Sequence, residues 1–207
     1  MSRTVRNLGI LVDSRLSFEN HVNNICKICH FHLRRIGSIR HLLTEDAAAT
    51  LARSFVLSRI DYCNSVLTGI TNEQISKLQR LQNRAAYIVS KTKSRSHISP
   101  VLNKLHWLRV RERINFKILS LTYQSINKSA PGYLQNLVSL YQPKRSLRSE
   151  GKLLLDVPAY NLKSFGSRTF RYSASILWNT LPENIRQCES VSVFKSKVNT
   201  WLFSHYH

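Results

Sequence analysis

Apolar residues recur at three- and four-residue steps along most of the chain, a spacing that places them on one face of an α-helix. The first such stretch begins at Phe18. Its predicted N-cap is Ser17, and we expect the helix to end or bend at Gly37. A second helix is predicted to begin after Thr44, because two acidic residues follow at the positive end of the helix dipole. This helix should run to about Ile60.

A third helix is predicted after Thr71, which begins a capping-box sequence, TNEQ. The apolar face of this helix consists of Ile75, Leu78, Leu81, Ala85 and Ile88. Five more helices are expected: one opened by Ser99-Pro100, one over residues 108–126, a short one ending near Leu140, and two over residues 172–179 and 192–204.

Strands are predicted at few places. Residues 5–12 form an apolar run that is typical of one strand with Gly9 inside it, and no convincing partner follows for a long stretch. Its neighbouring strands would then belong to a segment upstream. A basic linker is predicted over residues 142–149, and residues 152–157 and 163–170 are the later strand candidates.

These patterns predict a mainly α fold. We expect a helical bundle with a strand before it and a small mixed α/β region at the C-terminal end. The predicted domains are residues 1–16, residues 17–140 and residues 141–207. With 207 residues, 43% of them hydrophobic, the chain is long enough and apolar enough to form a core.

The chain is strongly basic, with 31 Lys and Arg against 11 Asp and Glu, a net charge of +20 and a pI near 10.4. This imbalance favours a polyanionic partner, either nucleic acid or an anionic membrane. Nucleic acid is preferred, because the amphipathic helices look like parts of a bundle and no run of 18 apolar residues exists. The N-terminus lacks the apolar core of a secretory signal, and the four cysteines suggest reduced thiols. We therefore predict an intracellular protein, nuclear or cytoplasmic and not secreted.

Basic residues on the predicted helices are candidates for phosphate contact. Lys77, Arg80, Arg84 and Lys91 fall within about 60° of one another on the wheel of the third helix. Arg40 lies with two other arginines on the first helix. The full set of predicted nucleic-acid-binding residues is Arg34, Arg35, Lys77, Arg80, Arg84, Lys91, Arg109, Arg111 and Arg113. An ordinary solvated surface is the alternative, but few acidic residues balance these charges, which favours phosphate contact.

Other side chains carry weaker signals. Tyr87 and Tyr123 are possible stacking partners for bases, whereas the three tryptophans sit in apolar patterns typical of a core. Residues 26–32, CKICHFH, contain two cysteines and two histidines. On a helix, His32 lies about 200° from His30, so four ligands do not converge and no metal site is predicted. Cys63 has no neighbouring histidine to act as a base, so no catalytic thiol is predicted.

Several stretches of the sequence resemble motifs of one protein family, and they occur in the same order as in that family. Residues 7–22, NLGILVDSRLSFENHV, are similar to the region that follows the polymerase palm in reverse transcriptases of LINE-type, non-LTR retrotransposons. Residues 58–64, SRIDYCN, 78–86, LQRLQNRAA, and 105–114, LHWLRVRERI, resemble the same post-palm region. Residues 146–149, SLRS, 166–170, GSRTF, and 178–186, WNTLPENIR, are similar to the end of jockey-like elements. The resemblance covers nearly the whole chain.

The resemblance implies that residues 17–140 are a thumb, which grips the template–primer duplex through its backbone, and that the opening strand is a remnant of the palm edge. The family holds metal ions on palm carboxylates that include an Asp-Asp turn. The aspartates here are Asp13, Asp46, Asp61 and Asp156, and no two adjoin. The chain is therefore predicted to be a non-catalytic fragment of an RNA-directed DNA polymerase, without cofactor or small-molecule substrate.

The partners predicted from this resemblance are nucleic acid, bound without sequence specificity, and the missing palm and fingers of the parent polymerase. No membrane partner is expected. Two alternatives stay open: an exapted helical module whose basic faces meet acidic proteins, and a translated relic without a role. An exposed apolar patch where the palm is missing would favour the first, and poor expression without a partner would favour the second.

Overall fold

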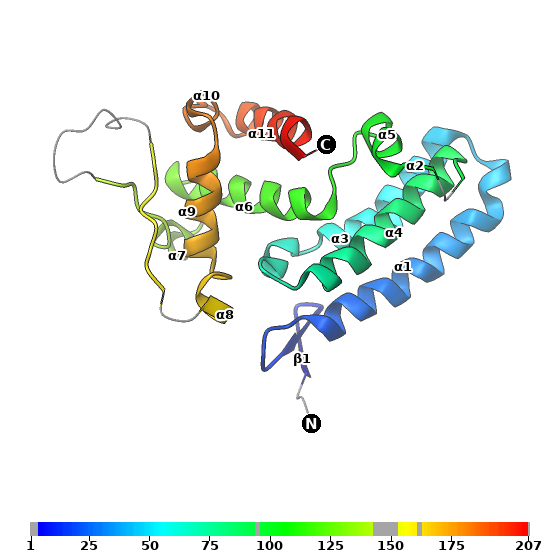
Figure 1. Cartoon of the computed structure of the whole chain (residues 1–207), viewed down its shortest axis with the longest axis horizontal. Helices are drawn as coiled ribbons and strands as arrows, with labels where there is room; N and C mark the ends of the chain where they lie inside the picture. Colours follow the sequence, from blue (N-terminus) through cyan, green and yellow to red (C-terminus); the bar gives the residue numbers. More distant parts are fainter. Residues whose placement is uncertain (1–3, 94–95, 143–152, 161–162, 207) are drawn as a thin grey trace. The chain divides into compact units, whose positions relative to one another are not determined.

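The structure is a computed structural model that describes residues 4–93, 96–142, 153–160 and 163–206 (Figure 1). Helices account for 67% of the residues that the structure describes and strands for 5%, which confirms the predicted mainly helical fold class. The chain divides into two compact units, residues 1–113 and residues 114–206. The predicted boundaries of the domains stay predictions.

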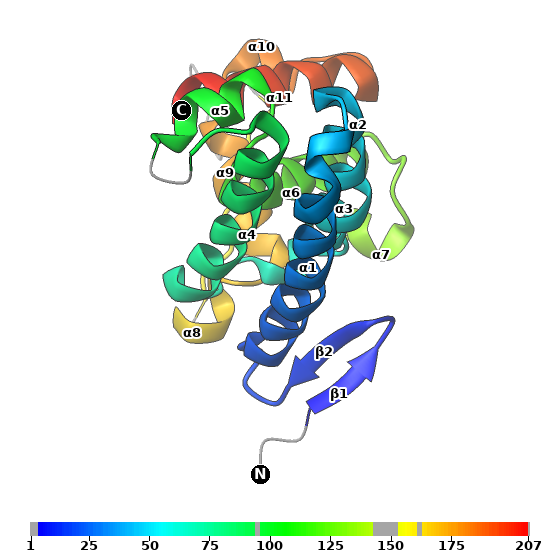
Figure 2. The same cartoon turned by 90° about the vertical axis from the view of Figure 1, so that its right-hand side faces the viewer.

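The first unit is a helical bundle with a β-hairpin at its N-terminal end (Figure 2). Its elements are β1 (Thr4–Asn7), β2 (Ile10–Asp13), α1 (Glu19–Ile39), the 3₁₀ helix η1 (Arg40–Leu42), α2 (Glu45–Ala52), the π-helical segment η2 (Arg53–Leu57), α3 (Ser58–Asp61), the 3₁₀ helix η3 (Asn64–Leu67), α4 (Asn72–Ser90) and α5 (Ile98–Lys104). The long helix α1 contacts α4 along one side and α2, η2 and α3 along the other.

The hairpin corrects the expectation of one strand over residues 5–12. β1 and β2 pair antiparallel, from Thr4 opposite Asp13 to Asn7 opposite Ile10. The two residues between them have φ values of 45° at Leu8 and 84° at Gly9, and a tight two-residue hairpin turn of this kind needs positive φ at both positions. Gly9 thus belongs to a turn, and the second strand of the pair lies within the run that seemed to be a single strand.

The N-cap residue of α1 is Phe18 and not the predicted Ser17, and Asp13 holds the loop that leads into the helix. The Asp13 carboxylate accepts hydrogen bonds from the backbone N–H groups of Arg15 at 3.0 Å, Ser17 at 3.1 Å and Phe18 at 2.8 Å. It also accepts one from the Ser17 hydroxyl at 3.0 Å. Phe18 has left-handed backbone geometry, with a φ of 56°, so α1 begins one residue later, at Glu19. A single carboxylate therefore joins the hairpin to the helix.

The helix starts at Thr44 and Thr71 follow the prediction. The Thr44 hydroxyl accepts from the Ala47 N–H at 3.2 Å, and α2, η2 and α3 then continue without a break to Asp61. The Thr71 hydroxyl accepts from the Gln74 N–H at 3.4 Å at the start of α4. The side chain of an N-cap residue bonds a backbone N–H within the first turn of the same helix. Its sequence signal is therefore local and can be recognised without knowledge of the fold.

Two expectations for helix ends need correction. α1 passes straight through Gly37 and ends at Ile39. α5 begins at Ile98, so Pro100 occupies the third position of the helix and not the first. Proline is tolerated there, because the first N–H groups of a helix have no hydrogen-bond partner within the helix. The helix expected over residues 108–126 is α6 (Val110–Ile126), and its N-terminal turn belongs to the first unit.

The core of the first unit lies between α1 and its neighbours. The buried side chains of α1 include Val22, Ile25, Cys29, Leu33 and Ile36, at the predicted spacing. The facing side chains of α4 are Leu78, Leu81 and Ala85, while the predicted Ile75 and Ile88 are only half-buried. Three alanines of α2 (Ala48, Ala49 and Ala52) complete the core on the other side. These small residues allow α2 to approach α1 and α4 closely.

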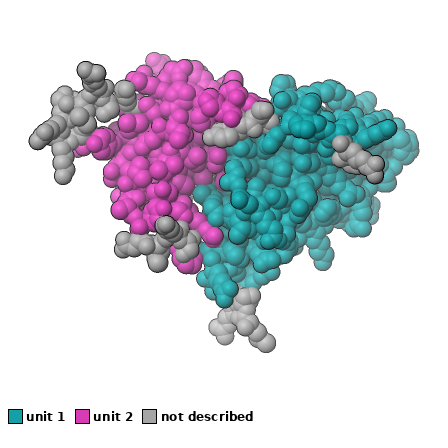
Figure 3. Space-filling model, in the orientation of Figure 1, with its two compact units in different colours: residues 1–113, 207 teal, residues 114–206 magenta. Residues whose placement is uncertain are grey.

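The second unit, magenta in Figure 3, is built around an aromatic core. It contains the rest of α6, α7 (Gly132–Gln135), α8 (Lys163–Gly166), α9 (Phe170–Thr180), α10 (Glu183–Arg186) and α11 (Val191–Tyr206). Tyr123 of α6 stacks on Phe194 of α11 with ring centroids 4.3 Å apart, and Phe194 lies 5.7 Å from Trp178 of α9. Tyr123 is 1% exposed, so this ring is not available to stack on bases.

An extended segment of the second unit, residues 153–157, is held by side chains of α9 and by two backbone hydrogen bonds to Ser139 and Tyr141, and not by a sheet. Trp178 Nε1 donates to the Leu153 carbonyl at 2.7 Å. The Asn179 amide bonds both the N–H and the carbonyl of Leu155, each at 2.9 Å. Within the part of this segment that the structure describes, the β-structure is one isolated bridge, between Leu140 and Leu155.

The strand predicted over residues 163–170 is wrong, because these residues form α8 and the start of α9. The linker predicted over residues 142–149 lies outside the described residues apart from Gln142. Among the helices that the structure describes, none is both long enough and apolar enough to cross a membrane.

Candidate nucleic-acid interface

Four of the predicted residues gather along the contact between α1 and α4. We call this set the basic face: it consists of Arg34, Lys77, Arg80 and Arg84. Arg34 and Arg84 both act on His30. Burial lowers the pKa of this histidine, and the positive charges of the two arginines lower it further. Likewise, burial raises the pKa of Cys26, and the charges of Lys77 and Arg80 oppose that rise. Residues that are far apart in the sequence thus lie near two side chains one turn apart on α1.

Three members of the basic face are accessible to a ligand. Arg34, Arg80 and Arg84 are exposed. Lys77 is more restricted: its side chain is 24% exposed, and its ammonium lies 3.1 Å from the Glu73 carboxylate one turn earlier. An ion pair at the surface of this kind is weak, since both groups remain solvated, so Lys77 still contributes charge to the surface.

Lys91 does not continue the basic face as the helical wheel suggested. α4 ends at Ser90, and Lys91 has left-handed backbone geometry with a φ of 55°. The regular rotation of 100° per residue on which the wheel depends therefore stops before Lys91. Its side chain is exposed beyond the C-terminus of the helix.

Arg35 lies on the other side of α1. Its guanidinium carbon is 5.1 Å from the centre of the Phe31 ring, within the range of a cation–π contact. Arg40, which the sequence grouped with these arginines, is buried. It donates to the carbonyls of Ile88 at 2.9 Å and Val89 at 2.6 Å, near the C-terminus of α4. Arg40 is therefore a structural residue that joins the ends of two helices.

The three arginines near the start of α6 are engaged within the protein. Arg113 forms a 2.6 Å ion pair with Asp61 and its side chain is only 16% exposed. Arg111 donates to the Asn72 side chain at 2.7 Å, and Arg109 donates to the Ser99 hydroxyl at 2.7 Å. Arg111 is the most exposed of the three and can still meet a phosphate, whereas Arg113 is held by an internal carboxylate.

Sequence reasoning missed two other cations, Arg6 of β1 and Arg59 of α3. Both line a hollow of about 460 Å³ between the hairpin, α1 and α3. The signal available for Arg59 was its place on the helix predicted to run from Thr44 to about Ile60. Arg6 gave no such signal, because the hairpin that carries it was not predicted.

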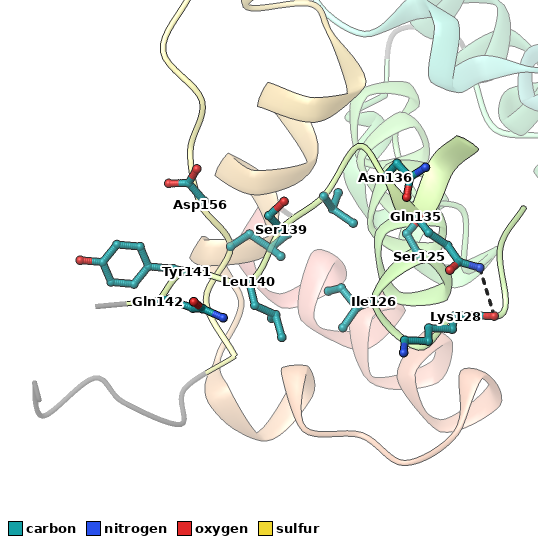
Figure 4. Close-up of a pocket in the computed structure, with 12 residues that line it drawn as sticks. Ser125, Ile126, Lys128, Gln135, Asn136, Ser139, Leu140, Tyr141, Gln142 and Asp156 are labelled. Atoms are coloured by element: carbon teal, nitrogen blue, oxygen red, sulfur yellow. Dashed lines mark hydrogen bonds between the residues drawn. The ribbon is translucent and has the colours of Figure 1, made fainter. Parts of the chain in front are cut away.

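A larger hollow, of about 1090 Å³, lies within the second unit (Figure 4). It is lined by α6, α7 and the extended residues that follow them, with Lys128 and Asp156 as its charged side chains. The Gln135 amide, which donates to the Lys128 carbonyl at 3.3 Å, forms part of its wall. One cation and one carboxylate offset each other, so this hollow is a poor match for a polyanion.

Potential metal ligands are scattered over the described part of the chain, where no group of three or more His, Cys, Asp or Glu side chains is placed to hold an ion. Cys29 is buried, and burial raises the pKa of its thiol to about 12. A thiol in this environment stays protonated and behaves as a small apolar side chain.

Comparisons of the chain with protein-family models, with curated proteins and with solved structures each found no match. The relation to reverse transcriptases therefore stays a prediction that rests on the sequence motifs. The geometry of the basic face does not depend on that relation.

Proposed function

We propose that this chain binds nucleic acid through the basic face, by contacts with the sugar–phosphate backbone and without sequence preference. The observation that carries the proposal is that exposed Arg34 of α1 and exposed Arg84 of α4 both act on His30, while exposed Arg80 of α4 acts on Cys26, one turn earlier in α1. Cations spread along two helices match a row of phosphates, and backbone contacts carry no sequence information. The net charge of +20 adds long-range attraction for any polyanion.

We also propose the origin that the motifs imply: a fragment of a LINE-type reverse transcriptase, from the region after the palm. In this role the first unit would hold a template–primer duplex, and the missing palm would carry out the chemistry. The protein by itself would then extend no primer. Primer extension on a poly-A template with Mg²⁺ or Mn²⁺ tests this, and activity that survives rigorous purification would contradict it.

The test of binding compares two double variants with the same loss of charge. Arg80→Ala/Arg84→Ala removes the centre of the basic face. Arg171→Ala/Lys195→Ala removes two exposed cations from α9 and α11 of the second unit. Affinity for a short duplex, and for the same duplex with its sequence scrambled, is measured by fluorescence anisotropy at low salt.

Arg80→Ala/Arg84→Ala should lose affinity for both duplexes, by about the same factor for each. Arg171→Ala/Lys195→Ala should bind nearly as well as the wild type. Circular dichroism verifies that both variants fold. Equal losses in the two variants would mean that net charge alone drives binding, and a strong dependence on duplex sequence would contradict the backbone mechanism.

A second function, a protein-interaction module, is favoured by one feature of the hairpin. Val5 is 63% exposed and Leu8 is 82% exposed, and in the described residues β1 pairs with β2 alone. An open strand edge with apolar side chains is a surface to which another strand can add. The absence of duplex binding at low salt would move the assignment to this function.

A further inference from the structure

An aromatic cluster lies where α1 packs on η2, on the flank of α1 opposite to α4, and its member Phe31 is three residues before Arg34 of the basic face. Phe31 and His32 of α1 meet Phe55 of η2. His32 and Phe55 stack with centroids 5.0 Å apart and planes 20° from parallel, and the rings of Phe31 and His32 form a T-shaped pair with centroids 5.4 Å apart. Phe31 is 47% exposed and Phe55 is 42% exposed, so both present ring surface to solvent.

The π-helical segment η2 is what presents Phe55. At its end the Ser58 N–H donates to the Arg53 carbonyl, five residues earlier, in place of the usual four. The next two residues, Val56 and Leu57, are both buried, while Phe55 stays at the surface. Single turns of π-helix inside an α-helical run occur frequently at functional sites.

Cations surround the cluster. Arg35 lies over the Phe31 ring at 5.1 Å. Burial lowers the pKa of His32, and the charges of Arg59 and Arg35 lower it further, so both arginines act on the cluster. The acidic residues of α1 and α3 are Glu19, at the far N-terminus of α1, and Asp61, which is paired with Arg113. The cluster is therefore a cationic surface that carries exposed rings.

The cluster continues into the smaller hollow of the first unit. Arg59 acts on His32 and also lines this hollow, which is lined by Arg6 and by the polar side chains of Asn24, Ser54 and Ser58 as well. Ring surfaces that suit a base thus lie beside guanidinium and hydroxyl groups that suit a phosphate. The volume of about 460 Å³ is ample for a phosphate and part of its sugar.

We infer that this surface, which we call the stacking site, binds single-stranded nucleic acid. Bases stack on Phe31 and Phe55, and a neighbouring phosphate enters the hollow between Arg6 and Arg59. A duplex does not fit this role, because its bases already stack on one another and hide their faces. An acidic peptide would satisfy the arginines but would gain nothing from flat rings. The inference rests on the proposed function, that the chain binds nucleic acid, and assigns single strands to residues other than those of the basic face.

The test uses two single strands with the same phosphates: an oligothymidylate and an abasic strand of equal length. The wild type should bind the oligothymidylate at least about five-fold more tightly, since base–aromatic stacking is worth roughly that factor or more for each base. Phe31→Leu/Phe55→Leu keeps apolar side chains but removes the rings, and it should bind the two strands equally. Its affinity for duplex should not change.

Two further variants define the outcome. Tyr133→Leu/Tyr141→Leu removes two exposed rings of the second unit and should keep the preference for bases. Phe31→Tyr/Phe55→Tyr keeps aromatic rings at both positions and should also keep the preference for bases. This variant shows whether the loss in Phe31→Leu/Phe55→Leu is due to the missing rings or to any substitution at these positions. Arg59→Ala should weaken binding of both single strands, because it acts on phosphate.

Equal binding of the two strands by the wild type would overturn the inference, and so would a preference that survives in a folded Phe31→Leu/Phe55→Leu variant. Binding of polyglutamate at this surface without any preference for bases would assign it to an acidic protein instead. If the wild type binds duplex but shows no preference for bases, only the stacking site fails. If it binds no nucleic acid at all, the proposed function fails with it.

Discussion

The two sides of α1 show how one helix supports two different surfaces. On the α4 side, the surface is made of long cationic side chains, with no ring among the residues of the basic face. On the α2–α3 side, the surface is made of stacked rings and a hollow, with arginines at the margin. The first suits evenly spaced phosphates, whatever the sequence, and the second suits unpaired bases. Residues at the two edges of one apolar stripe therefore favour different forms of nucleic acid.

The largest expected effect comes from the core that both surfaces share. Leu33 is 1% exposed in the middle of the apolar stripe of α1. Leu33→Ala should lower the free energy of unfolding by about 2–5 kcal/mol, because it removes buried methyl groups and leaves a cavity. Urea unfolding measures this, with Lys27→Ala on the exposed side of α1 as the control. If α1 is the common support, duplex and single-strand binding should weaken together; loss of one alone would separate the two surfaces.

Helix positions were largely predictable, because their signals act over a few residues. The caps at Thr44 and Thr71 and the apolar stripe of α1 were all read correctly from spacing. The hairpin was not, because its turn places Leu8 at a positive φ that leucine rarely adopts, so Leu8-Gly9 lacks the usual turn composition. The extended segment held by Trp178 and Asn179 was mistaken for a strand, since hydrogen bonds between a side chain and a distant backbone leave no periodic pattern.

The candidate sites were predictable only in part. Lys77, Arg80 and Arg84 share one helix, so the wheel grouped them correctly. Their meeting with Arg34 depends on how α1 and α4 pack, and the ion pair that occupies Arg113 depends on Asp61 from another helix. The aromatic cluster was invisible for the same reason, because Phe55 reaches His32 only when η2 packs on α1. Contacts between elements are not encoded by the spacing within either element.

A smaller effect is expected at Asp13, which joins the hairpin to α1. Burial acts to raise the pKa of this carboxyl, but the hydrogen bonds from Ser17, Phe18 and Arg15 outweigh it and hold the pKa below the ordinary 3.8. The stabilisation is therefore complete above pH 3.8 and is lost as the pH falls through the lower pKa of the folded state.

Asp13→Ala should cost about 1–3 kcal/mol at neutral pH, because several N–H groups lose their acceptor. Because the hairpin adjoins the hollow, single-strand binding should suffer more than duplex binding. Urea unfolding at pH 7 with paired binding assays measures both, and equal losses in the two assays would contradict the link between hairpin and stacking site.

The smallest expected effect is a dependence of stability on mild acid through His21. This side chain is buried at the wall of the hollow, and its Nδ1 accepts a hydrogen bond from the Leu11 N–H at 3.4 Å. Burial lowers its pKa below the ordinary 6.5, so the unfolded chain binds more protons than the folded chain as the pH falls below neutrality. Stability should therefore be greater at pH 7.5 than at pH 5.5.

His21→Asn should reduce the difference between the unfolding free energies at these two pH values. Urea unfolding of the wild type and of His21→Asn at pH 7.5 and pH 5.5 measures this difference. A variant with the same pH dependence as the wild type would show that other groups, such as His30 and His32, carry it.

The most direct test of the basic face is the salt dependence of duplex binding. Each neutralised phosphate releases condensed counterions, so log affinity should fall linearly with log salt, with a slope of about 0.9 per phosphate contacted. If Arg80 and Arg84 each contact one phosphate, Arg80→Ala/Arg84→Ala should flatten the slope by about 1.8, whereas Arg171→Ala/Lys195→Ala should leave it unchanged. A folded Arg80→Ala/Arg84→Ala protein with the slope of the wild type would contradict the central claim, because the basic face would then not be where the duplex binds.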